Sequence, residues 1–529
     1  MNKHLVNPFL NKGLSFSETE REEFGLIGLL PHKVVSIESE IKRLYERLEI
    51  LETDYQKCLF LNDIYNTNRQ LFFKLVEAYV VELMPIIYTP TIAESVTQFS
   101  SDFKWPQGAL YLDTDHPEEI GIALENATRD MDVLDCMVIT DGEGVLGIGD
   151  WGINGVMISV GKLGVYTVAS GLNPSRVLPV VIDNGTNRSE LLNNPYYLGK
   201  KTSRKQGEDY LNFIDQFVTI AEEKFPGVLL HWEDFGRDNA QVILDRYRHQ
   251  VTTFNDDIQG TGIMMIAAFD KAVQVMEKPF SEQRICIFGA GTAGVGIAEQ
   301  LKNELIFRGQ TEEEAREQIF LVDRNGLVVT SDTAVTLGQK EFAKDSEAIL
   351  DLESIIEAIQ PTVLIGCSGQ AGKFTQEVVT RMSHYNELPA IFPISNPTHL
   401  AEAQAKDIIE WSNGKALVVT GSPTPPFEYG ETTFTIGQAN NALLYPGLGL
   451  GIIAAKAKSV TNSMLLEAAH AISDWHIYEK AGDGLLPHIT QLKQCSDRVA
   501  QAVYMDAVKN KLSLKTLEEM PIAITNMKW

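Results

Sequence analysis

The chain of 529 residues has few cysteines and no long apolar run, and both absences narrow what it can be. Its five cysteines are scattered and lack the spacing of a metal-binding motif, so we expect reduced thiols and a cytoplasmic protein. No stretch approaches the length needed to span a bilayer. The N-terminal sequence MNKHLVNPFLNKG has no apolar core of the kind that secretion signals carry.

Basic residues are also in deficit. The 45 basic and 71 acidic side chains give a formal net charge of −26. Such a surface repels nucleic-acid phosphate and anionic membranes, so neither is an expected partner. Ordinary solubility explains the acidic charge equally well. An anionic ligand would need a locally positive site, built from a metal ion or a few cations.

The chain is too long for one hydrophobic core, so at least two domains are expected. Residues 1–108 read as helical, with apolar residues at three- and four-residue steps in 36–51 and in 71–84, where Pro85 should end the helix. From residue 110 onward, short apolar runs alternate with helical patterns, which predicts parallel α/β layers. The expected strands are 133–140, 145–148, 177–182 and 228–231, then 284–288, 319–322, 362–366, 390–394 and 416–420. The helices we single out are 210–224, one capped by Thr311 and Glu314, 448–457 and 463–472.

A glycine-rich motif follows the first of the later strands. Gly289, Gly291 and Gly294 form GxGxxG between the strand RICIF and a helical pattern. This context predicts a dinucleotide site, in which the backbone and a helix N-terminus approach the pyrophosphate. Asp323 ends the next strand, where a carboxylate can accept hydrogen bonds from the ribose and disfavour a 2′-phosphate, although Arg324 could reverse that preference. The separation of 34 residues from Gly289 requires a long helix or an inserted loop.

Two acidic pairs end apolar runs. Glu233 and Asp234 lie in HWEDF, and Asp256 and Asp257 lie in FNDDIQG. Carboxylates suit hard cations such as Mg²⁺ and Mn²⁺. The alternative is that Asp256 or Asp257 merely caps the helix that follows.

Two further residues stand out because of their apolar surroundings. Lys162 lies in the apolar run ISVGKLGVYT, where it is either a desolvated base or a lysine that reaches solvent. Tyr88, between Pro85 and Pro90, reads by itself as a core aromatic residue.

Taken together, these motifs resemble those of the malic enzyme family over nearly the whole chain. YTPT, GDWGINGV, VGKL, EDF, FNDDIQGT, ISNPT and GQANN occur in that family's order. The resemblance implies NAD and Mn²⁺ or Mg²⁺ as cofactors and L-malate as substrate. It implies that the metal ligands are Glu233, Asp234 and Asp257, that the base is Lys162 with Asp256 assisting, that the acid is Tyr88, and that Asn396 and Asn441 bind substrate and the nicotinamide end.

The chain departs from the common malic enzyme pattern at three positions. The family usually has an arginine that clamps a malate carboxylate where this chain has Gly144, and Trp151 and Arg237 also differ. These details resemble the malolactic branch, which implies conversion of L-malate to L-lactate and CO₂ with NAD held throughout. The alternatives are an NAD-dependent malic enzyme that yields pyruvate and NADH, and a non-catalytic nucleotide-binding protein. Arg188 or Arg237 could replace the lost cation, or both could be surface arginines.

The resemblance also implies the architecture. We expect a helical domain at 1–108, a malate- and metal-binding α/β domain formed by 109–255 and 442–515, a Rossmann-type NAD domain at 256–441, and a C-terminal tail at 516–529. A homodimer or homotetramer is expected.

Overall fold

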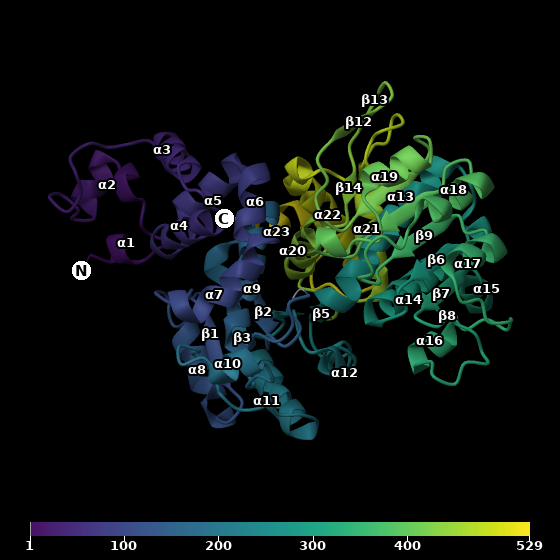
Figure 1. Cartoon of the computed structure of the whole chain (residues 1–529). Coiled ribbons are helices and arrows are strands. Elements are labelled where there is room, and N and C mark those ends of the chain that lie inside the picture. The colour runs from purple at the N-terminus through teal and green to yellow at the C-terminus, as the bar shows by residue number, and fades with distance from the viewer. Residues whose placement is uncertain (1, 146) are drawn as a thin grey trace. The chain divides into compact units, whose positions relative to one another are not determined.

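The computed structural model describes residues 2–145 and 147–529, with Arg237 described by its backbone alone. The chain divides into two compact units (Figure 1). Unit 1 comprises Met1–Thr253 and Pro521–Trp529, and unit 2 comprises Phe254–Met520. Among the described helices, none is long and apolar enough to cross a membrane.

Unit 1 begins with helices, as the sequence predicts. These are α1 (Lys3–Val6), α2 (Glu18–Glu23), α3 (Ile37–Glu49), α4 (Asp54–Thr67), α5 (Arg69–Ala78), α6 (Val80–Ile87) and α7 (Thr91–Asp102). The predicted apolar face of α3 is real, since Leu44 and Leu48 are buried while its charged residues, apart from Glu40, point outward.

The predicted helix over 71–84 is wrong in two respects. The chain forms two helices, α5 and α6, which meet at Tyr79 with φ −128° and ψ 47°. The ring of Tyr79 stacks on Tyr45 with centroids 3.5 Å apart, and this packing holds the break. Pro85 lies inside α6 and does not end it. Because α6 finishes only two residues later, the proline removes a single backbone donor and leaves little helix to disrupt.

A five-stranded sheet follows these helices in the chain, and its strands β1 to β4 belong to unit 1. Its order is β1-β3-β2-β4-β5, and β3 pairs in parallel with β1 and β2 while β2 pairs in parallel with β4. The strands are β1 (Leu110–Asp113), β2 (Cys136–Thr140), β3 (Val177–Asp183), β4 (Leu229–Trp232) and β5 (Thr253–Asn255). All residues of β2 and β3 are buried, as expected of parallel strands covered on both faces. The helices α8 (Ile120–Thr128), α10 (Ser189–Asn193), α11 (Glu208–Lys224) and α12 (Arg237–Tyr247) belong to this layer.

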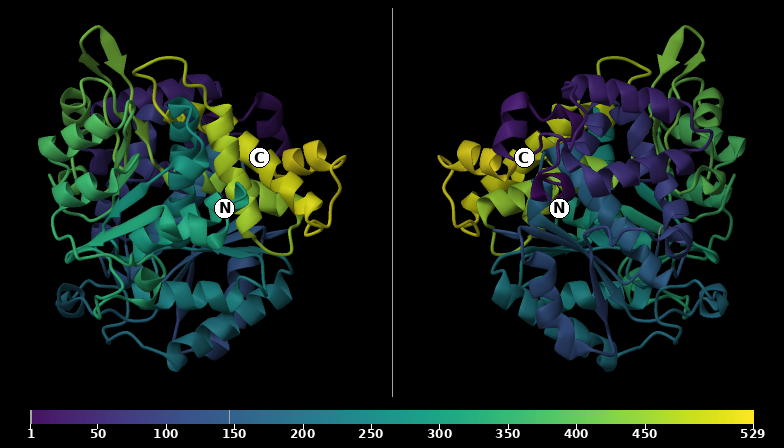
Figure 2. Two further views of the ribbon diagram at one scale, coloured as in Figure 1. Left: turned by 90° about the vertical axis from the view of Figure 1, so that its right-hand side faces the viewer. Right: turned by 90° about the vertical axis from the view of Figure 1, so that its left-hand side faces the viewer.

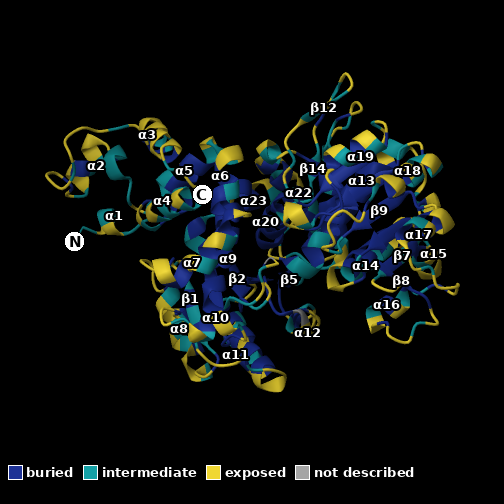
Figure 3. Ribbon diagram, viewed as in Figure 1, coloured by how far each residue is buried: buried dark blue, intermediate teal, exposed yellow. Residues whose placement is uncertain are grey.

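Helix α9 (Val156–Ser170) is the centre of unit 1. It contacts β2 and β3 on one side and α5 and α7 on another, and every one of its residues is buried (Figure 3). When this run is wound as a helix, apolar residues lie around its whole circumference, so every face of the helix is buried.

The strand predicted at 145–148 does not form. Val145 makes an isolated bridge to Gly149, and Gly147 and Gly149 adopt positive φ values that fold the segment into a tight loop; Leu146 lies outside the described residues. Glycine permits these dihedral angles, so the apolar residues here line a loop and not a sheet.

Unit 2 contains a seven-stranded sheet in the order β14-β11-β10-β9-β6-β7-β8. Reading β6 as the first strand, the order from β7 to β14 is that of a Rossmann-type sheet, and the short antiparallel β8 takes the edge position beside β7. The strands are β6 (Ile285–Phe288), β7 (Ile319–Asp323), β8 (Gly326–Leu327), β9 (Val363–Gly366), β10 (Ala390–Pro393), β11 (Leu417–Thr420) and β14 (Gly437–Gln438), with a hairpin of β12 (Phe427–Tyr429) and β13 (Thr432–Phe434).

The helices of unit 2 account for the long spacing between Gly289 and Asp323. Helix α14 (Thr292–Phe307) is followed by the extra helix α15 (Glu312–Glu317), whose Thr311–Glu314 capping box is present as predicted. The remaining helices are α13 (Thr261–Met276), α16 (Leu337–Glu341), α17 (Leu352–Ile359), α18 (Gln376–Tyr385) and α19 (Ala405–Trp411).

The C-terminal helices pack together within unit 2 (Figure 2). They are α20 (Tyr445–Ala455), α21 (Asn462–Trp475) and α22 (Leu492–Lys509), and α21 also packs on α13. The last helix, α23 (Met520–Met527), leads back to unit 1, where Trp529 N–H donates to Gly171 O at 2.9 Å. The predicted grouping of 442–515 with 109–255 in one domain stays a prediction.

Close packing of α20 on α22 requires glycine at position 451, because a Cβ there would lie 2.6 Å from Ala500 O. We therefore expect Gly451→Ala to lower the free energy of unfolding by about 1–3 kcal/mol. Gly164 of α9 is the matched control, since a Cβ there meets no atom within 4 Å. Gly164→Ala should be neutral or stabilising by up to ~1 kcal/mol. Thermal unfolding of both variants measures this, and equal stabilities would contradict the packing argument.

Candidate active site

Lys162 lies in the middle of α9 with 1% of its surface exposed. Its Nζ forms an ion pair with Oε1 of Glu233, which is also 1% exposed. The structure therefore decides between the two interpretations of this lysine: it does not reach solvent. A charge buried this deeply needs a partner, and Glu233 provides one.

Glu233 follows β4 directly and is held on both sides. Its N–H donates to Ile139 O at 2.9 Å, which continues the pairing of β4 with β2. While Oε1 meets Lys162, Oε2 lies 3.3 Å from Nε2 of His231, and the His231 Nδ1 lies 2.9 Å from the hydroxyl of Tyr166 on α9. This chain of contacts fixes the carboxylate between a helix and a strand of unit 1. His231 and Tyr166 were not among the predicted site residues, although His231 stands in the HWEDF motif.

Asp234 has an unusual backbone conformation. Its φ is +53°, in the left-handed region that non-glycine residues seldom occupy, and it is 2% exposed. Its carbonyl accepts a hydrogen bond from Gly144 N–H at 2.9 Å. Backbone strain of this kind persists where surrounding contacts impose it, and it is common at functional sites.

The structure excludes a side chain at position 144. A Cβ on Gly144 would lie 2.6 Å from Phe235 O, and the backbone would have to shift to admit it. The carboxylate-binding arginine that is typical of the malic enzyme pattern therefore cannot be accommodated on this backbone. The close packing of the loop against residues 234 and 235 leaves no room for this arginine.

The loop from Asp141 to Trp151 is anchored by Arg204, which sequence reasoning missed. The Arg204 guanidinium is buried, bonds to both carboxylate oxygens of Asp150 and donates to Asp141 O at 3.0 Å. Burial alone would raise the pKa of Asp150, but the hydrogen bond and charge of Arg204 hold it below its usual value. Nothing in the polar sequence around Arg204 distinguishes it from a surface residue.

Arg188, the residue before α10, packs against the same loop. Its guanidinium carbon is 4.0 Å from the centroid of the Trp151 ring, and its Nη1 donates to Ile148 O at 3.0 Å. It also lies 3.3 Å from the exposed Glu190. Arg188 is thus half-buried and held in place, which differs from a mobile surface arginine. The side chain of Arg237 lies outside what the structure describes.

Tyr88 ends α6 and is 7% exposed. It packs against α9 at the residue before Lys162, since a Cβ on Gly161 would lie 3.3 Å from Cδ2 of Tyr88. Tyr88, Lys162, Glu233 and Asp234 therefore gather in one part of unit 1, as the motifs implied.

The second acidic pair follows β5, the neighbour of β4 in the sheet. Thr253 Oγ1 donates to Leu230 O at 2.7 Å, and the chain then turns into a π-helical segment, Asp256–Gly260. The residue that caps this turn is Asn255, whose side chain accepts from Ile258 N–H, so capping does not explain Asp256 and Asp257. Short π-helical segments occur often at functional sites.

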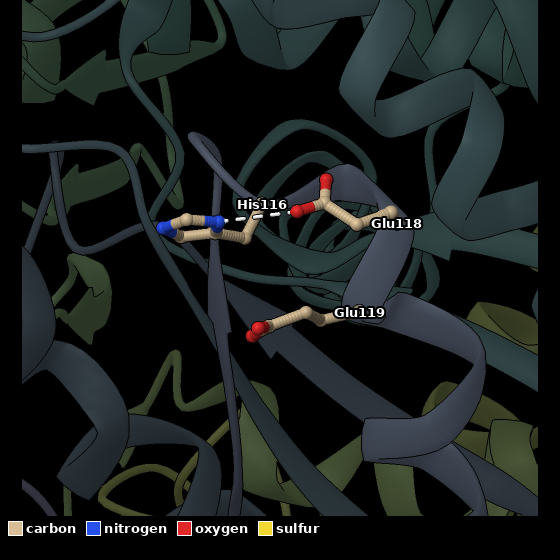
Figure 4. A group of neighbouring side chains, drawn as sticks. All are labelled: His116, Glu118 and Glu119. Carbon is tan, nitrogen blue, oxygen red and sulfur yellow. Dashed lines mark hydrogen bonds and ion pairs between the residues drawn. The ribbon is translucent and has the colours of Figure 1, made fainter.

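The described chain contains three groups of side chains that could hold a metal ion. Glu233, Asp234 and Asp257 form one, and His231, Glu233 and Asp256 form another that shares Glu233. The third group, His116, Glu118 and Glu119, is exposed, and His116 pairs with Glu118 as in an ordinary surface ion pair (Figure 4).

Unit 2 contains the predicted nucleotide-binding loop. Gly289 has φ +119°, and a Cβ there would lie 2.7 Å from Ser368 N. A Cβ on Gly294 would lie 2.0 Å from Gly289 O, so this glycine permits close packing of α14 on β6. Gly291 is different, because a Cβ there meets nothing within 4 Å at the N-terminus of α14. The loop is therefore closely packed at Gly289 and Gly294 and leaves free space at Gly291, as pyrophosphate binding requires.

Three more predicted residues lie in unit 2. Asp323 is half-buried at the end of β7, and one of its oxygens accepts from Asn325 N–H at 2.7 Å. Asn396 is exposed and accepts from Ser422 Oγ through its Oδ1 at 2.6 Å. Asn441 donates to Asp256 Oδ2 at 3.0 Å, so the structure joins these two residues.

The strand order and the open glycine loop define unit 2 as a dinucleotide-binding unit, coupled in sequence to an α/β unit with buried acidic residues. The family model described as "Malic enzyme, N-terminal domain" matches residues 65–248, and "Malic enzyme, NAD binding domain" matches residues 258–508. The chain belongs to the malic enzyme family, and its cofactor is NAD.

The relatives carry two different names. "Malolactic enzyme" of Leuconostoc mesenteroides is 45% identical, covering 99% of this chain and 98% of its own. "NAD-dependent malic enzyme 3" of Bacillus subtilis is 44% identical, covering 99% and 94%. The crystal structure of Entamoeba histolytica malic enzyme has the same fold, with a TM-score of 0.58 over 93% of both chains at 18% identity.

The open position at Gly291 generates a prediction. Gly291→Asp should fold normally, because the new side chain has space and an aspartate stabilises a helix N-terminus. Its negative charge would repel the pyrophosphate, so we expect the NAD dissociation constant to rise at least about tenfold. Calorimetric titration with NAD, alongside thermal unfolding, measures both effects. Undiminished NAD binding by the folded variant would contradict this placement of the pyrophosphate.

Proposed function

We propose that this chain is a malolactic enzyme, which converts L-malate to L-lactate and CO₂ with NAD retained during turnover. The observation that carries the proposal is Gly144, whose packing against Phe235 O excludes the arginine of the usual malic enzyme pattern. Relatives named malolactic enzyme, at 44–45% identity over 99% of the chain, support it. The second candidate is an NAD-dependent malic enzyme yielding pyruvate and NADH, supported by the Bacillus subtilis relative.

We infer that Glu233, Asp234 and Asp257 hold a Mn²⁺ or Mg²⁺ ion. The donor set fits, because all three are carboxylates, the ligands that these hard cations prefer. Glu233 and Asp234 are nearly fully buried, and Asp257 follows the strand that neighbours theirs. Such an ion would supply Lewis acidity at the oxygen on malate C2. It would also provide positive charge in a chain whose net charge is −26.

The resemblance to the malic enzyme family implies roles for the remaining residues. Lys162 takes the proton of the C2 hydroxyl, with Asp256 assisting. The bond between C3 and the neighbouring carboxylate breaks as CO₂ leaves, and Tyr88 donates a proton to C3. Lys162 then returns its proton to the C2 oxygen, so that the product is lactate. NAD, held by the loop of Gly289, Gly291 and Gly294, would supply the acceptor and then the donor of the C2 hydride. Asn396 and Asn441 orient the substrate and the nicotinamide, and Asp323 accepts hydrogen bonds from the ribose.

We also propose the substrate, the partners and the cellular location of the enzyme. L-malate is its only expected small-molecule substrate, and neither nucleic acid nor a membrane is an expected partner. All five cysteines are free, which suits the cytoplasm. A homodimer or homotetramer remains our expectation.

Arg188 is our candidate for the cation that replaces the missing arginine. It is fixed to the loop that carries Gly144 by its stacking on Trp151 and its bond to Ile148 O. A planar guanidinium can bind a carboxylate through two parallel hydrogen bonds, and an unpaired substrate carboxylate in a closed site would be costly.

We expect Arg188→Ala to raise the malate KM about tenfold or more, because a charge-assisted hydrogen bond is lost. Arg237→Ala tests the second candidate in the same assay. The exposed Arg129 of the same unit provides a control, and Arg129→Ala should leave KM unchanged. An unchanged KM in both the Arg188 and Arg237 variants would eliminate this explanation.

The reaction itself is tested by incubating the purified protein with L-malate, Mn²⁺ and substoichiometric NAD. We expect lactate far in excess of the NAD supplied, with no increase in NADH absorbance. Lys162→Met is the negative control, and its rate should fall at least about 100-fold, as removal of a general base implies. Pyruvate and NADH in equal amounts would establish the malic enzyme reaction instead. Full turnover by the Lys162 variant would refute the catalytic assignment.

A further inference from the structure

Arg69 is a buried arginine whose charge has no carboxylate partner among the residues that the structure describes. It is the first residue of α5, and only 6% of its surface is exposed. Its guanidinium carbon lies 3.2 Å from the centroid of Tyr65 and 5.2 Å from that of Phe9. Within residues 2–145 and 147–529, it has no carboxylate partner and its Nε has no hydrogen-bond acceptor.

The other buried arginines of the described chain show how unusual this is. Arg21 donates to five backbone carbonyls, and Arg204 is paired with Asp141 and Asp150. Stacking on Tyr65 covers the face of the Arg69 guanidinium, whereas its in-plane Nε has no acceptor in the described chain. Burial lowers the pKa of Arg69, which reflects the cost of keeping this charge away from water.

Arg69 lines a cavity of about 270 Å³ within unit 1. This volume is many times what a single water molecule occupies. The cavity extends from the N-terminal segment around Pro8 to the start of β3, and its wall includes Leu163 of α9. Gly108 also lines the cavity, and a Cβ there would lie 3.4 Å from Nη2 of Arg69.

Two amide side chains of the cavity wall have their acceptors already engaged. Oε1 of Gln107 accepts from Asn66 Nδ2, and Oδ1 of Asn126 accepts from Nη2 of Arg129. The polar group that each has left is an N–H₂ donor. A buried guanidinium with two amide donors forms a wall that complements a negative charge. The exposed Asp130, which also lines the cavity, disfavours large polyanions.

We propose that this cavity binds a small oxyanion, either a carboxylate of a few carbons or inorganic phosphate, through Arg69, Gln107 and Asn126. The guanidinium fork matches the oxygen geometry of both anions. The bound anion supplies Arg69 with the counter-charge that the described residues do not provide. None of these residues belongs to the proposed catalytic set, so the site is additional to the malate site.

Thermal unfolding of the full chain, with Mg²⁺ and NAD present and ionic strength held constant, tests the proposal with succinate and with phosphate. At ten times its dissociation constant, the preferred anion should raise the Tm by roughly 2–4 °C. Arg69→Met keeps the apolar contact with Tyr65 and removes the charge, so it should abolish this rise while leaving the malate KM unchanged. Arg47→Met, which removes an exposed charge from α3, should behave as the wild type does.

Gly108→Asp provides a second variant in case Arg69→Met does not fold. Aspartate tolerates the positive φ of 65° at this position and would bring a carboxylate beside Nη2 of Arg69. We expect a higher Tm without added anion and no further rise with it. A response to only one of the two anions identifies the chemical class. Equal rises in all the variants, or no rise in the wild type with either anion, would overturn the proposal.

Discussion

Lys162 and Glu233 form an ion pair in unit 1 from which water is almost completely excluded. Removing two charges from water is costly, and such a pair contributes little stability compared with apolar residues of the same size. What it does provide is geometry. Glu233 follows β4 and Lys162 lies on α9. His231 contacts both Glu233 and Tyr166 of α9, which makes a second link between strand and helix. The apolar packing of α9 therefore maintains a lysine and a carboxylate in fixed positions, and the proposed chemistry requires both.

A second constraint comes from the backbone next to this pair. Asp234 is held with positive φ, its carbonyl accepts from Gly144, and Phe235 O leaves no room for a side chain at 144. These three features of the backbone depend on one another. A residue larger than glycine would displace the carbonyl groups that orient the proposed ligand Asp234. The lost arginine and the strained aspartate are therefore coupled, and a cation for the substrate must come from a residue outside position 144.

Much of this could be predicted from the sequence, because apolar runs determine strands and GxGxxG acts through backbone alone. The prediction failed where local pattern and tertiary packing disagree. Residues 145 and 148 read as a strand, but glycines between and beside them turn the chain. Pro85 is tolerated because α6 ends soon after it. Arg204 and Arg69 carry no sequence signal, since only the fold decides which arginine is withdrawn from water and what surrounds it.

The acidic composition gives the buried cations their significance. The surface, with a net charge of −26, repels an anionic substrate. Each cation that is buried inside the protein must be compensated by groups next to it. The chain does this differently at each position: backbone carbonyls surround Arg21, two aspartates hold Arg204, and a glutamate holds Lys162. At Lys162 the partner is itself a proposed metal ligand, so the charge that stabilises the lysine is shared with the ion. At Arg69 the described residues provide no carboxylate partner, and the same rule of local compensation favours the anion that we propose in the cavity.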